Sequence, residues 1–367
     1  MRIIEKNNRF IEEFEKASKG GKRIFIFGGG SGARIVYEKV CKSDGRNIPV
    51  EAFVLNDDYY DLSNMREMLG LPVIPVRDLD RDDPNIFVGL GYSHYDYFDN
   101  DPVIPTMKGF FACYDLFSFF DKSGTKSYLD YDFCIQNVGG LREIYDSFAD
   151  QKSKDVMDAY LNQRISGKFD YLKEFKDDDQ YYNDEVLDLS RIENIVDCGA
   201  YNGDSFERFR NNFEQRTGEK YMGQAWLWEA ESKNVDVLIN KYADDKNVHV
   251  IGIGAGKEKA IVKFGGEGTA GSIGAGDDEI EIDSIDHIVG GKVNFIKMDI
   301  EGAEYDALLG ARDTICRDKP VLAICVYHKR DDLLTIPKLI RSFSAEYRFY
   351  LRAYSRHSSE IVLYAVI

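Results

Sequence analysis

The chain has 367 residues, of which 64 are acidic and 47 are Lys or Arg, so its formal net charge is −17. This excess of acid argues against a protein that binds nucleic acid or an anionic membrane surface, since both need clustered positive charge. The hydrophobic fraction of 44% excludes an intrinsically disordered chain, and the length favours two domains.

Membrane and targeting segments are not expected. No apolar run approaches the roughly 20 residues of a spanning helix, and the charged start of the chain lacks the apolar core of a signal peptide. We therefore expect a cytoplasmic protein. The cysteines form no CxxC pair and no zinc spacing, so they are interpreted as reduced core residues: Cys41, Cys113, Cys134, Cys198, Cys316 and Cys325.

The first predicted domain, residues 1–125, has a strand that runs into a glycine-rich turn, RIFIFGGGSGA. Further apolar runs at 50–57 and 85–91, and a shorter one within 69–79, predict a small parallel sheet. The turn has the GxGxxA spacing of a loop that binds a pyrophosphate, and an acid ends the next strand, where it could hold a ribose. The candidates for a nucleotide site are Gly28, Gly30, Ser31, Gly32 and Asp57.

This first segment resembles the small Rossmann-like domains at the front of sugar-modifying acyltransferases and epimerase-like proteins, through IFGxGxxxRxV, FVxND and GLPVI. No Tyr-x-x-x-Lys pair supplies a hydride-transfer apparatus, so we favour a binding or scaffold role. A domain that binds nothing remains an alternative.

Helices are predicted over residues 132–176, where Leu141, Ile144, Tyr145 and Phe148 recur with helical spacing. They form a helical connector, residues 126–180, which ends in the acidic stretch KDDDQYYNDE.

The last predicted domain, residues 181–367, alternates strands and helices. Strands are expected at 195–198, 225–230, 247–253, 293–299 and 321–327, with helices after residues 203, 232, 303 and 331. Two apolar segments, YRFYLRAY and EIVLYAVI, predict an antiparallel hairpin. A parallel sheet that ends in such a hairpin is typical of class I methyltransferases, so the predicted fold is α/β, with two Rossmann-like doubly wound domains.

The loop DCGAYNG follows the strand at 195–198 and opens a helix, which predicts close approach of its backbone to a nucleoside cofactor. Glu229 ends the next strand, where a carboxylate can accept hydrogen bonds from ribose hydroxyls. Tight packing of the glycines and a solvated strand end are the alternatives. The cofactor candidates in the loop are Asp197, Gly199, Ala200, Tyr201 and Gly203.

Asp299 and Glu301 follow the strand at 293–299, at the carboxyl edge of the sheet where doubly wound folds bind ligands. They could orient a substrate hydroxyl, accept its proton or hold a divalent ion such as Mg²⁺. Favourable charge at a helix N-terminus is the alternative for Glu301 and Glu304. His328 follows the next strand at the same edge and is the candidate base, with a surface or core histidine as the alternative. No residue is assigned as a metal ligand.

The glycine-rich segment at 265–276 is too rich in glycine for a helix or a packed strand. It is interpreted as a mobile lid over the acceptor, or equally as a flexible excursion.

The segments VDCGAYNGDSFERF, WLWEAESKNVDVL, FIKMDIEGAEYDALLGA and YLRAYSRHSSEIVLYAV resemble the FkbM family of S-adenosylmethionine-dependent methyltransferases. The resemblance covers the chain from Tyr181 onward. It implies that Asp197, Gly199 and Gly203 line the cofactor, that Glu229 holds its ribose, and that Asp299 and Glu301 lie at the transfer site. The chain departs from many members at Ala230 and Cys325.

The resemblance implies methyl transfer from S-adenosylmethionine to a hydroxyl of a sugar, a nucleotide-sugar or a related small molecule. An NAD(P)-dependent oxidoreductase and a non-catalytic nucleotide-binding protein are the alternatives. We expect a small-molecule acceptor, no nucleic-acid or membrane partner, and leave a homo-oligomer open.

Overall fold

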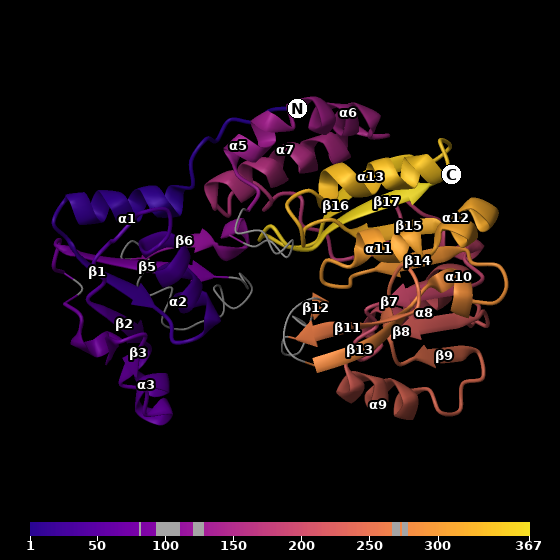
Figure 1. The fold of residues 1–367 in the computed structure, drawn as a ribbon, viewed down its shortest axis with the longest axis horizontal. Helices are drawn as coiled ribbons and strands as arrows, with labels where there is room; N and C mark the ends of the chain where they lie inside the picture. Colours follow the sequence, from indigo (N-terminus) through magenta and orange to yellow (C-terminus); the bar gives the residue numbers. More distant parts are fainter. Residues whose placement is uncertain (81, 93–110, 120–127, 266–271, 274–277) are drawn as a thin grey trace.

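The computed structural model describes residues 1–80, 82–92, 111–119, 128–265, 272–273 and 278–367. Two sheets lie side by side, with helices bridging above them (Figure 1). Among the described residues, none of the helices combines the length and the apolar character needed to cross a membrane.

The first sheet has strand order β3-β4-β2-β1-β5-β6, and all of its neighbouring strands are parallel except β3 and β4. This confirms a parallel α/β sheet in the N-terminal part; β6 was not predicted. The strands are β1 (Arg23–Phe27), β2 (Ala52–Leu55), β3 (Glu67–Met68), β4 (Leu71–Pro75), β5 (Ile86–Tyr92) and β6 (Phe111–Asp115). The helices are α1 (Arg9–Lys19), α2 (Ser31–Ile35), the π-helix η1 (Val36–Cys41), α3 (Asp57–Ser63) and the 3-10 helices η2 (Val76–Asp78) and η4 (Leu116–Phe119).

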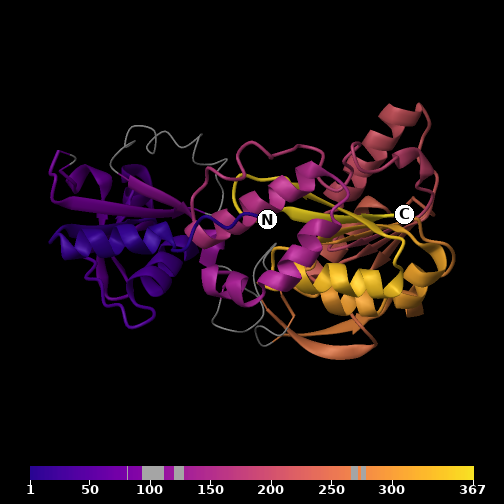
Figure 2. The same cartoon turned by 90° about the horizontal axis from the view of Figure 1, so that it is seen from above.

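The connector contains three helices, α5 (Tyr131–Gln136), α6 (Val138–Ser147) and α7 (Gln151–Ser166). The predicted helical stretch to residue 176 is too long, because Gly167 adopts a left-handed conformation (φ 73°) that ends α7. Residues at the start of the chain run along α7, where the amide of Arg2 donates to Asp158 and that of Ile4 donates to Asn162, both at 2.7 Å. Figure 2 shows this end of the chain beside the connector helices.

The second sheet has the order β16-β17-β15-β14-β7-β8-β9, with β17 antiparallel to both of its neighbours and the other pairs parallel. This confirms the predicted class I fold with its terminal hairpin. The strands are β7 (Ile195–Cys198), β8 (Ala225–Trp228), β9 (Val248–Ile251), β14 (Phe295–Met298), β15 (Val321–Cys325), β16 (Arg348–Ala353) and β17 (Ile361–Val366). The helices are η5 (Leu189–Arg191), α8 (Asp204–Thr217), α9 (Ser232–Lys241), α10 (Ile285–Ile288), α11 (Glu304–Leu309), α12 (Arg312–Asp318) and α13 (Asp332–Phe343).

A small additional sheet of order β10-β13-β11-β12 was not predicted. Its strands are β10 (Gly254–Ala255), β11 (Ala260–Gly265), β12 (Ser272–Ile273) and β13 (Asp278–Asp283). The predicted lid at 265–276 lies mostly outside the described residues. Its described part pairs β12 with β11, so the expectation that no strand forms in this segment was wrong there.

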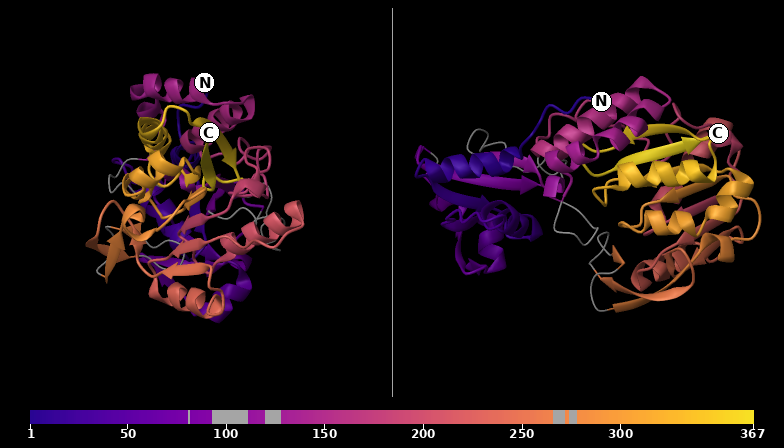
Figure 3. Two further views of the ribbon diagram at one scale, coloured as in Figure 1. Left: turned by 90° about the vertical axis from the view of Figure 1, so that its right-hand side faces the viewer. Right: turned by 45° about the horizontal axis from the view of Figure 1, so that its top comes forward.

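The buried side chains show which parts pack as one body. The connector helices and the second sheet share a single hydrophobic core, whereas the first sheet has separate cores on its two faces. The right-hand view of Figure 3 shows the connector arching from one sheet to the other. Cys316 is exposed, which corrects the expectation that it is a core residue; the buried free cysteines are Cys41, Cys134, Cys198 and Cys325.

Asp115, at the end of β6, ties these parts together. Its buried carboxylate accepts hydrogen bonds from Gln163 of α7 (2.9 Å) and from the amide of Ser358 in the β16–β17 loop (2.7 Å). Burial raises the pKa of this carboxyl despite these hydrogen bonds. One side chain thus links the first sheet, the connector and the terminal hairpin.

Candidate functional site

A cavity of about 680 Å³ lies at the carboxyl edge of the second sheet. Its volume falls in the range typical of small-molecule sites, roughly 300–1,000 Å³. Side chains from the β7–α8 loop, the ends of β8, β14 and β15, the β16–β17 loop and the connector line it. Ser31, Gly32 and Ile35 of the first domain also line it, so both domains contribute to one cavity.

The β7–α8 loop needs glycine at two positions. Gly199 has φ 81°, and a Cβ there would lie 1.9 Å from the carbonyl oxygen of Asp299. Gly203 has φ 80°, and a Cβ there would lie 2.6 Å from the hydroxyl of Tyr242. Both positions combine a left-handed backbone with crowding that a side chain cannot enter. Gly199 and Tyr201 line the cavity; Ala200 is buried, and neither it nor Gly203 lines it.

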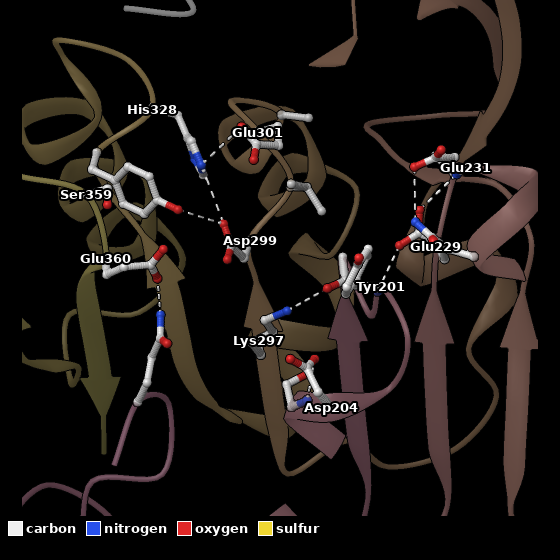
Figure 4. A pocket seen from close by; sticks show the side chains of 18 of the residues that line it. Tyr201, Asp204, Glu229, Glu231, Lys297, Asp299, Glu301, His328, Ser359 and Glu360 are labelled. Carbon is white, nitrogen blue, oxygen red and sulfur yellow. Dashed lines mark hydrogen bonds and ion pairs between the residues drawn. The ribbon is translucent and has the colours of Figure 1, made fainter. Parts of the chain in front are cut away.

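Glu229 lines the cavity just beyond β8 (Figure 4). Its carboxylate accepts hydrogen bonds from the amides of Tyr201 and Glu231, each at 2.8 Å. Burial nevertheless raises the pKa of Glu229, since it outweighs these backbone donors. The carboxylate therefore holds the β7–α8 loop. It also lines the cavity, as its predicted contact with a ribose requires.

Asp197 lies in β7, underneath the loop, and does not line the cavity. Its carboxylate accepts a hydrogen bond from Ser205 (2.5 Å) and pairs with Lys297 (3.0 Å). The ammonium group of Lys297 also donates to the carbonyl of Gly199 at 2.7 Å. The expectation of direct contact between Asp197 and a cofactor is thus corrected to a positioning role, because burial places the carboxylate behind the loop.

A carboxylate–histidine cluster, formed by Asp299, Glu301, Glu304 and His328, lies at the ends of β14 and β15. Nε2 of His328 is 3.5 Å from Oδ1 of Asp299 and 3.5 Å from Oε2 of Glu301. Its Nδ1 is 2.9 Å from Oε1 of Glu304. The predicted trio of Asp299, Glu301 and His328 is therefore brought together at one cavity wall, with Glu304 behind it.

Charge in this cluster changes the interpretation of His328. Burial lowers the pKa of the imidazole, but Glu304, Asp299 and Glu301 outweigh it and raise the pKa to about 9. The protein without ligands therefore holds His328 as a cation at neutral pH. In that state the ring has no vacant nitrogen, so both the base role expected from the sequence and the binding of a metal ion require the loss of one ring proton.

Three further cavity residues were not selected as site residues from the sequence, because packing or exposure explained each of them as well as a ligand contact did. The hydroxyls of Tyr181 and Tyr327 donate to Asp299, at 2.7 and 3.3 Å. Glu360, in the β16–β17 loop, contacts Gln180 and has a left-handed backbone (φ 57°), unusual for a residue with a side chain. Burial first, and then the charge of Asp299, raise the pKa of Glu360 to about 7. The signal for Glu360 in the sequence was an acid that follows two serines and precedes an apolar strand. An exposed hairpin explains that pattern equally well.

The nucleotide-site candidates of the first domain are divided by the structure. Ser31 and Gly32 line the cavity, whereas Gly28, Gly30 and Asp57 do not. Oδ1 of Asp57 accepts a hydrogen bond from the amide of Arg77 at 3.0 Å. Asp57 therefore binds the backbone of η2, and of the nucleotide-site candidates only Ser31 and Gly32 face the shared cavity.

Residues 197–354 match the family model of the methyltransferase FkbM domain. The C-terminal part of this chain is an FkbM methyltransferase domain. The protein is accordingly an S-adenosylmethionine-dependent methyltransferase.

Solved structures resemble the chain to different extents. The methyltransferase FkbM from Methylobacillus flagellatus KT is 24% identical with a TM-score of 0.72, and the match covers 97% of this chain and 99% of that one. This likeness shows a shared fold over nearly the whole chain. Fibrillarin from Aeropyrum pernix, in complex with S-adenosylmethionine, is 12% identical with a TM-score of 0.31, covering 49% of this chain and 69% of that one. A search of curated proteins found no match.

The residues present fit S-adenosylmethionine. The backbone of the FkbM domain at Gly199 approaches the cavity closely, the Glu229 carboxylate can hold ribose hydroxyls, and the cavity is lined by acids that suit a cationic molecule. When bound, the cofactor supplies an electrophilic methyl group.

Proposed function

We propose that this methyltransferase O-methylates a hydroxyl of a sugar, a nucleotide-sugar or a related small molecule. The observation that carries the proposal is the shape of the cavity, which extends from Glu229 past Asp299 to Ser31 of the first domain. It has room for an acceptor beside the cofactor, and its polar lining suits a molecule with many hydroxyls.

Polar and aromatic groups lie at the proposed acceptor end of the cavity. His357 of the β16–β17 loop stacks on Phe117 with ring centroids 5.0 Å apart, and both line the cavity. Ser355 and Ser359 of the same loop add hydroxyls. An aromatic face beside hydrogen-bonding groups is a suitable platform for a sugar ring or a base.

Glu360 is the chain's own proton acceptor in this proposal. It lines the cavity near Asp299, and Figure 4 shows its carboxyl group on the side of the cavity where Asp299 and His328 lie. A base works best when its pKa is near the working pH, and that of Glu360 is raised to about 7. Asp299, held by Tyr181, would orient the hydroxyl while Glu360 takes its proton.

Of the residues predicted to bind a nucleotide in the first domain, those at the start of α2 keep this role in the proposal. Ser31 and Gly32 would contact the distal part of an acceptor, such as the nucleotide of a nucleotide-sugar. A neutral sugar would leave this end of the cavity less filled. The Mg²⁺ ion that the sequence suggested at Asp299 and Glu301 is not part of this proposed function.

Calorimetric titration with S-adenosylhomocysteine tests the cofactor half of the site. Glu229→Gln should weaken binding by about 10- to 100-fold, the loss expected for hydrogen bonds to a charged group. Glu214→Gln, on the exposed face of α8, is the matched control and should bind like the wild type. Equal affinity of the two variants would remove Glu229 from the cofactor site.

A panel of sugars and nucleotide-sugars, assayed with labelled S-adenosylmethionine, tests the acceptor. We expect label in at least one hydroxyl-bearing member, at an oxygen located by mass spectrometry. Transfer only to nitrogen or carbon acceptors, or to none of the panel while a different class is methylated, would overturn the proposal. Binding of NAD without binding of S-adenosylhomocysteine would favour the oxidoreductase alternative instead.

A further inference from the structure

The carboxylate–histidine cluster contains three donor atoms that converge from different elements. One atom each from Asp299, Glu304 and His328 lie within 4.8 Å of one another. Ligands on opposite sides of a divalent ion at bonds of about 2.1 Å stand roughly 4.2 Å apart. The side chains therefore need to move by only a few tenths of an ångström to share one ion.

Buried polar atoms in the cluster lack hydrogen-bond partners. Oε1 of Glu304 accepts a hydrogen bond from the amide of Ile300 (2.9 Å), but Oε2 has no partner among the described residues. Nδ1 of His328 pairs with Oε1 of Glu304 at 2.9 Å, whereas Nε2 has no partner in hydrogen-bonding geometry among the described residues and lies 3.5 Å from Asp299 and Glu301. Glu304 is 0% exposed and His328 is 1% exposed. A carboxylate oxygen withdrawn from water without a partner is costly, so these atoms point to a missing ligand.

The missing ligand should be a small cation. Asp299, Glu301 and Glu304 place three carboxylates around the single imidazole of His328, so the cluster has more acidic than basic groups. Among the basic side chains nearby, Lys297 is engaged by Asp197, and Lys329 lies beside Asp332. Glu304 does not line the cavity, and a cofactor the size of S-adenosylmethionine cannot reach it. A single metal ion can.

We propose that Asp299, Glu304 and His328 bind a divalent first-row transition ion, for which Mn²⁺ is the probe. An imidazole nitrogen combined with carboxylate oxygens suits Mn²⁺, Fe²⁺ or Zn²⁺, whereas Mg²⁺ prefers oxygen donors alone. This set differs from the sequence-based pair, Asp299 and Glu301, because donor atoms of Asp299, Glu304 and His328 converge, and Glu304 also has a buried oxygen without a partner among the described residues. Glu301 lies nearby, with Oε2 at 3.5 Å from His328.

The orientation of the site gives the ion a role, which rests on the proposed function. Asp299 and His328 line the cavity, while Glu304 closes the far side. The remaining coordination positions therefore face the acceptor end of the cavity. An ion there would lower the pKa of an acceptor hydroxyl, whose proton would pass to Glu360 as the oxygen attacks the methyl group.

Binding of Mn²⁺ alone tests the site without any assay of activity. The chelator-treated full chain is titrated with Mn²⁺, and the free ion is followed by its electron paramagnetic resonance signal. We expect one ion per chain in the wild type and at least about 10-fold weaker binding in Glu304→Gln. Asp306→Asn, which removes an exposed acid from the same helix, is the matched control and should bind like the wild type.

His328→Gln is the second variant, in case Glu304→Gln does not fold; circular dichroism reports folding for both. Equal Mn²⁺ binding by the wild type and by a folded variant would overturn the proposal, as would no binding by the wild type at millimolar Mn²⁺. In either case the cluster would be an ion-pair network neutralised by the protonated His328. S-adenosylhomocysteine binding is measured on the same samples. Mn²⁺ binding without sugar methylation would refute the proposed acceptor but support the metal site. Sugar methylation that resists chelator, in a protein that binds no Mn²⁺, would support the acceptor and refute the metal site.

Discussion

The ammonium group of Lys297 lies 3.0 Å from Oδ1 of Asp197, and both side chains are withdrawn from solvent. Lys297 also holds the carbonyl of Gly199, so this buried pair supports the loop that forms the cofactor side of the cavity. The same lysine is placed next to Asp299, whose charge contributes to raising the pKa of Lys297. Burial alone would lower that pKa, so the carboxylates keep the lysine charged.

Removal of this lysine should destabilise the fold. Lys297→Met leaves the buried charge of Asp197 without its cation, and we expect a loss of about 3–5 kcal/mol in the free energy of unfolding. Urea denaturation measures it. Lys19→Met, which removes an exposed ion pair with Glu15, is the control and should unfold like the wild type. An unchanged midpoint for Lys297→Met would show that the pair does not stabilise the loop.

Alanine variants of two glycines allow the effect of backbone strain to be measured separately from that of steric crowding. Gly199 and Gly218 both have left-handed backbones, with φ of 81° and 74°, but only Gly199 is crowded; at Gly218 nothing lies within 4 Å of an added Cβ. Alanine at either position should cost roughly 1–2 kcal/mol of strain. Gly199→Ala should in addition displace Asp299 and abolish binding of S-adenosylhomocysteine, whereas Gly218→Ala keeps it. Calorimetry on both variants decides, and retained binding by Gly199→Ala would contradict the close packing.

Neighbouring tyrosines offer a test of the contact to Asp299. Tyr181 donates to Asp299, whereas the buried hydroxyl of Tyr182 has no partner within the described part of the chain. Tyr181→Phe should lower kcat by about 10-fold, the value of a hydrogen bond to a charged group, with little change in cofactor affinity. Tyr182→Phe should leave kcat unchanged and keep or increase stability. Similar kcat values for the two variants would exclude Tyr181 from positioning Asp299.

Activity should depend on pH through Glu360. Burial and the charge of Asp299 raise its pKa to about 7, and a base must be ionised to act. We expect kcat/KM to rise about 10-fold per pH unit below this value and to level off above it. Glu360→Gln should lower the rate by about 10²- to 10⁴-fold and remove this limb. Glu346→Gln changes an exposed acid and should keep the wild-type pH profile. If Glu360→Gln also kept that profile, the rise of kcat/KM with pH would belong to another group.

The sequence allowed most of the sheet framework to be predicted. Buried strands such as Ile195–Cys198 and Phe295–Met298 are short apolar runs followed by turn residues. This pattern can be recognised from a short stretch of sequence alone. The small sheet around β11 was missed because its residues are half exposed and charged, as in Ala260–Gly265. The end of α7 was misplaced because the apolar spacing continues past Gly167, whose left-handed conformation decides the boundary.

The candidate site was predicted only where it depends on strand ends. Asp299, Glu301 and His328 meet because parallel strands bring their carboxyl ends to one edge. Glu304 and Glu360 were missed as functional because their role depends on burial and on neighbours distant in sequence, which no local pattern reports. The protonation of His328 likewise follows from three carboxylates around one ring, and could not be read from its position after a strand.

The position of β17 has a consequence for synthesis. β17 follows β16 along the chain, yet it lies between β15 and β16 in the sheet. Until Ile361–Val366 is made, β15 has an unpaired apolar edge of the kind that promotes aggregation. A chain stopped before Ile361 would therefore be a target for chaperones or proteases rather than a partly active enzyme, since Glu360 would also lose the strand that fixes it beside the cavity.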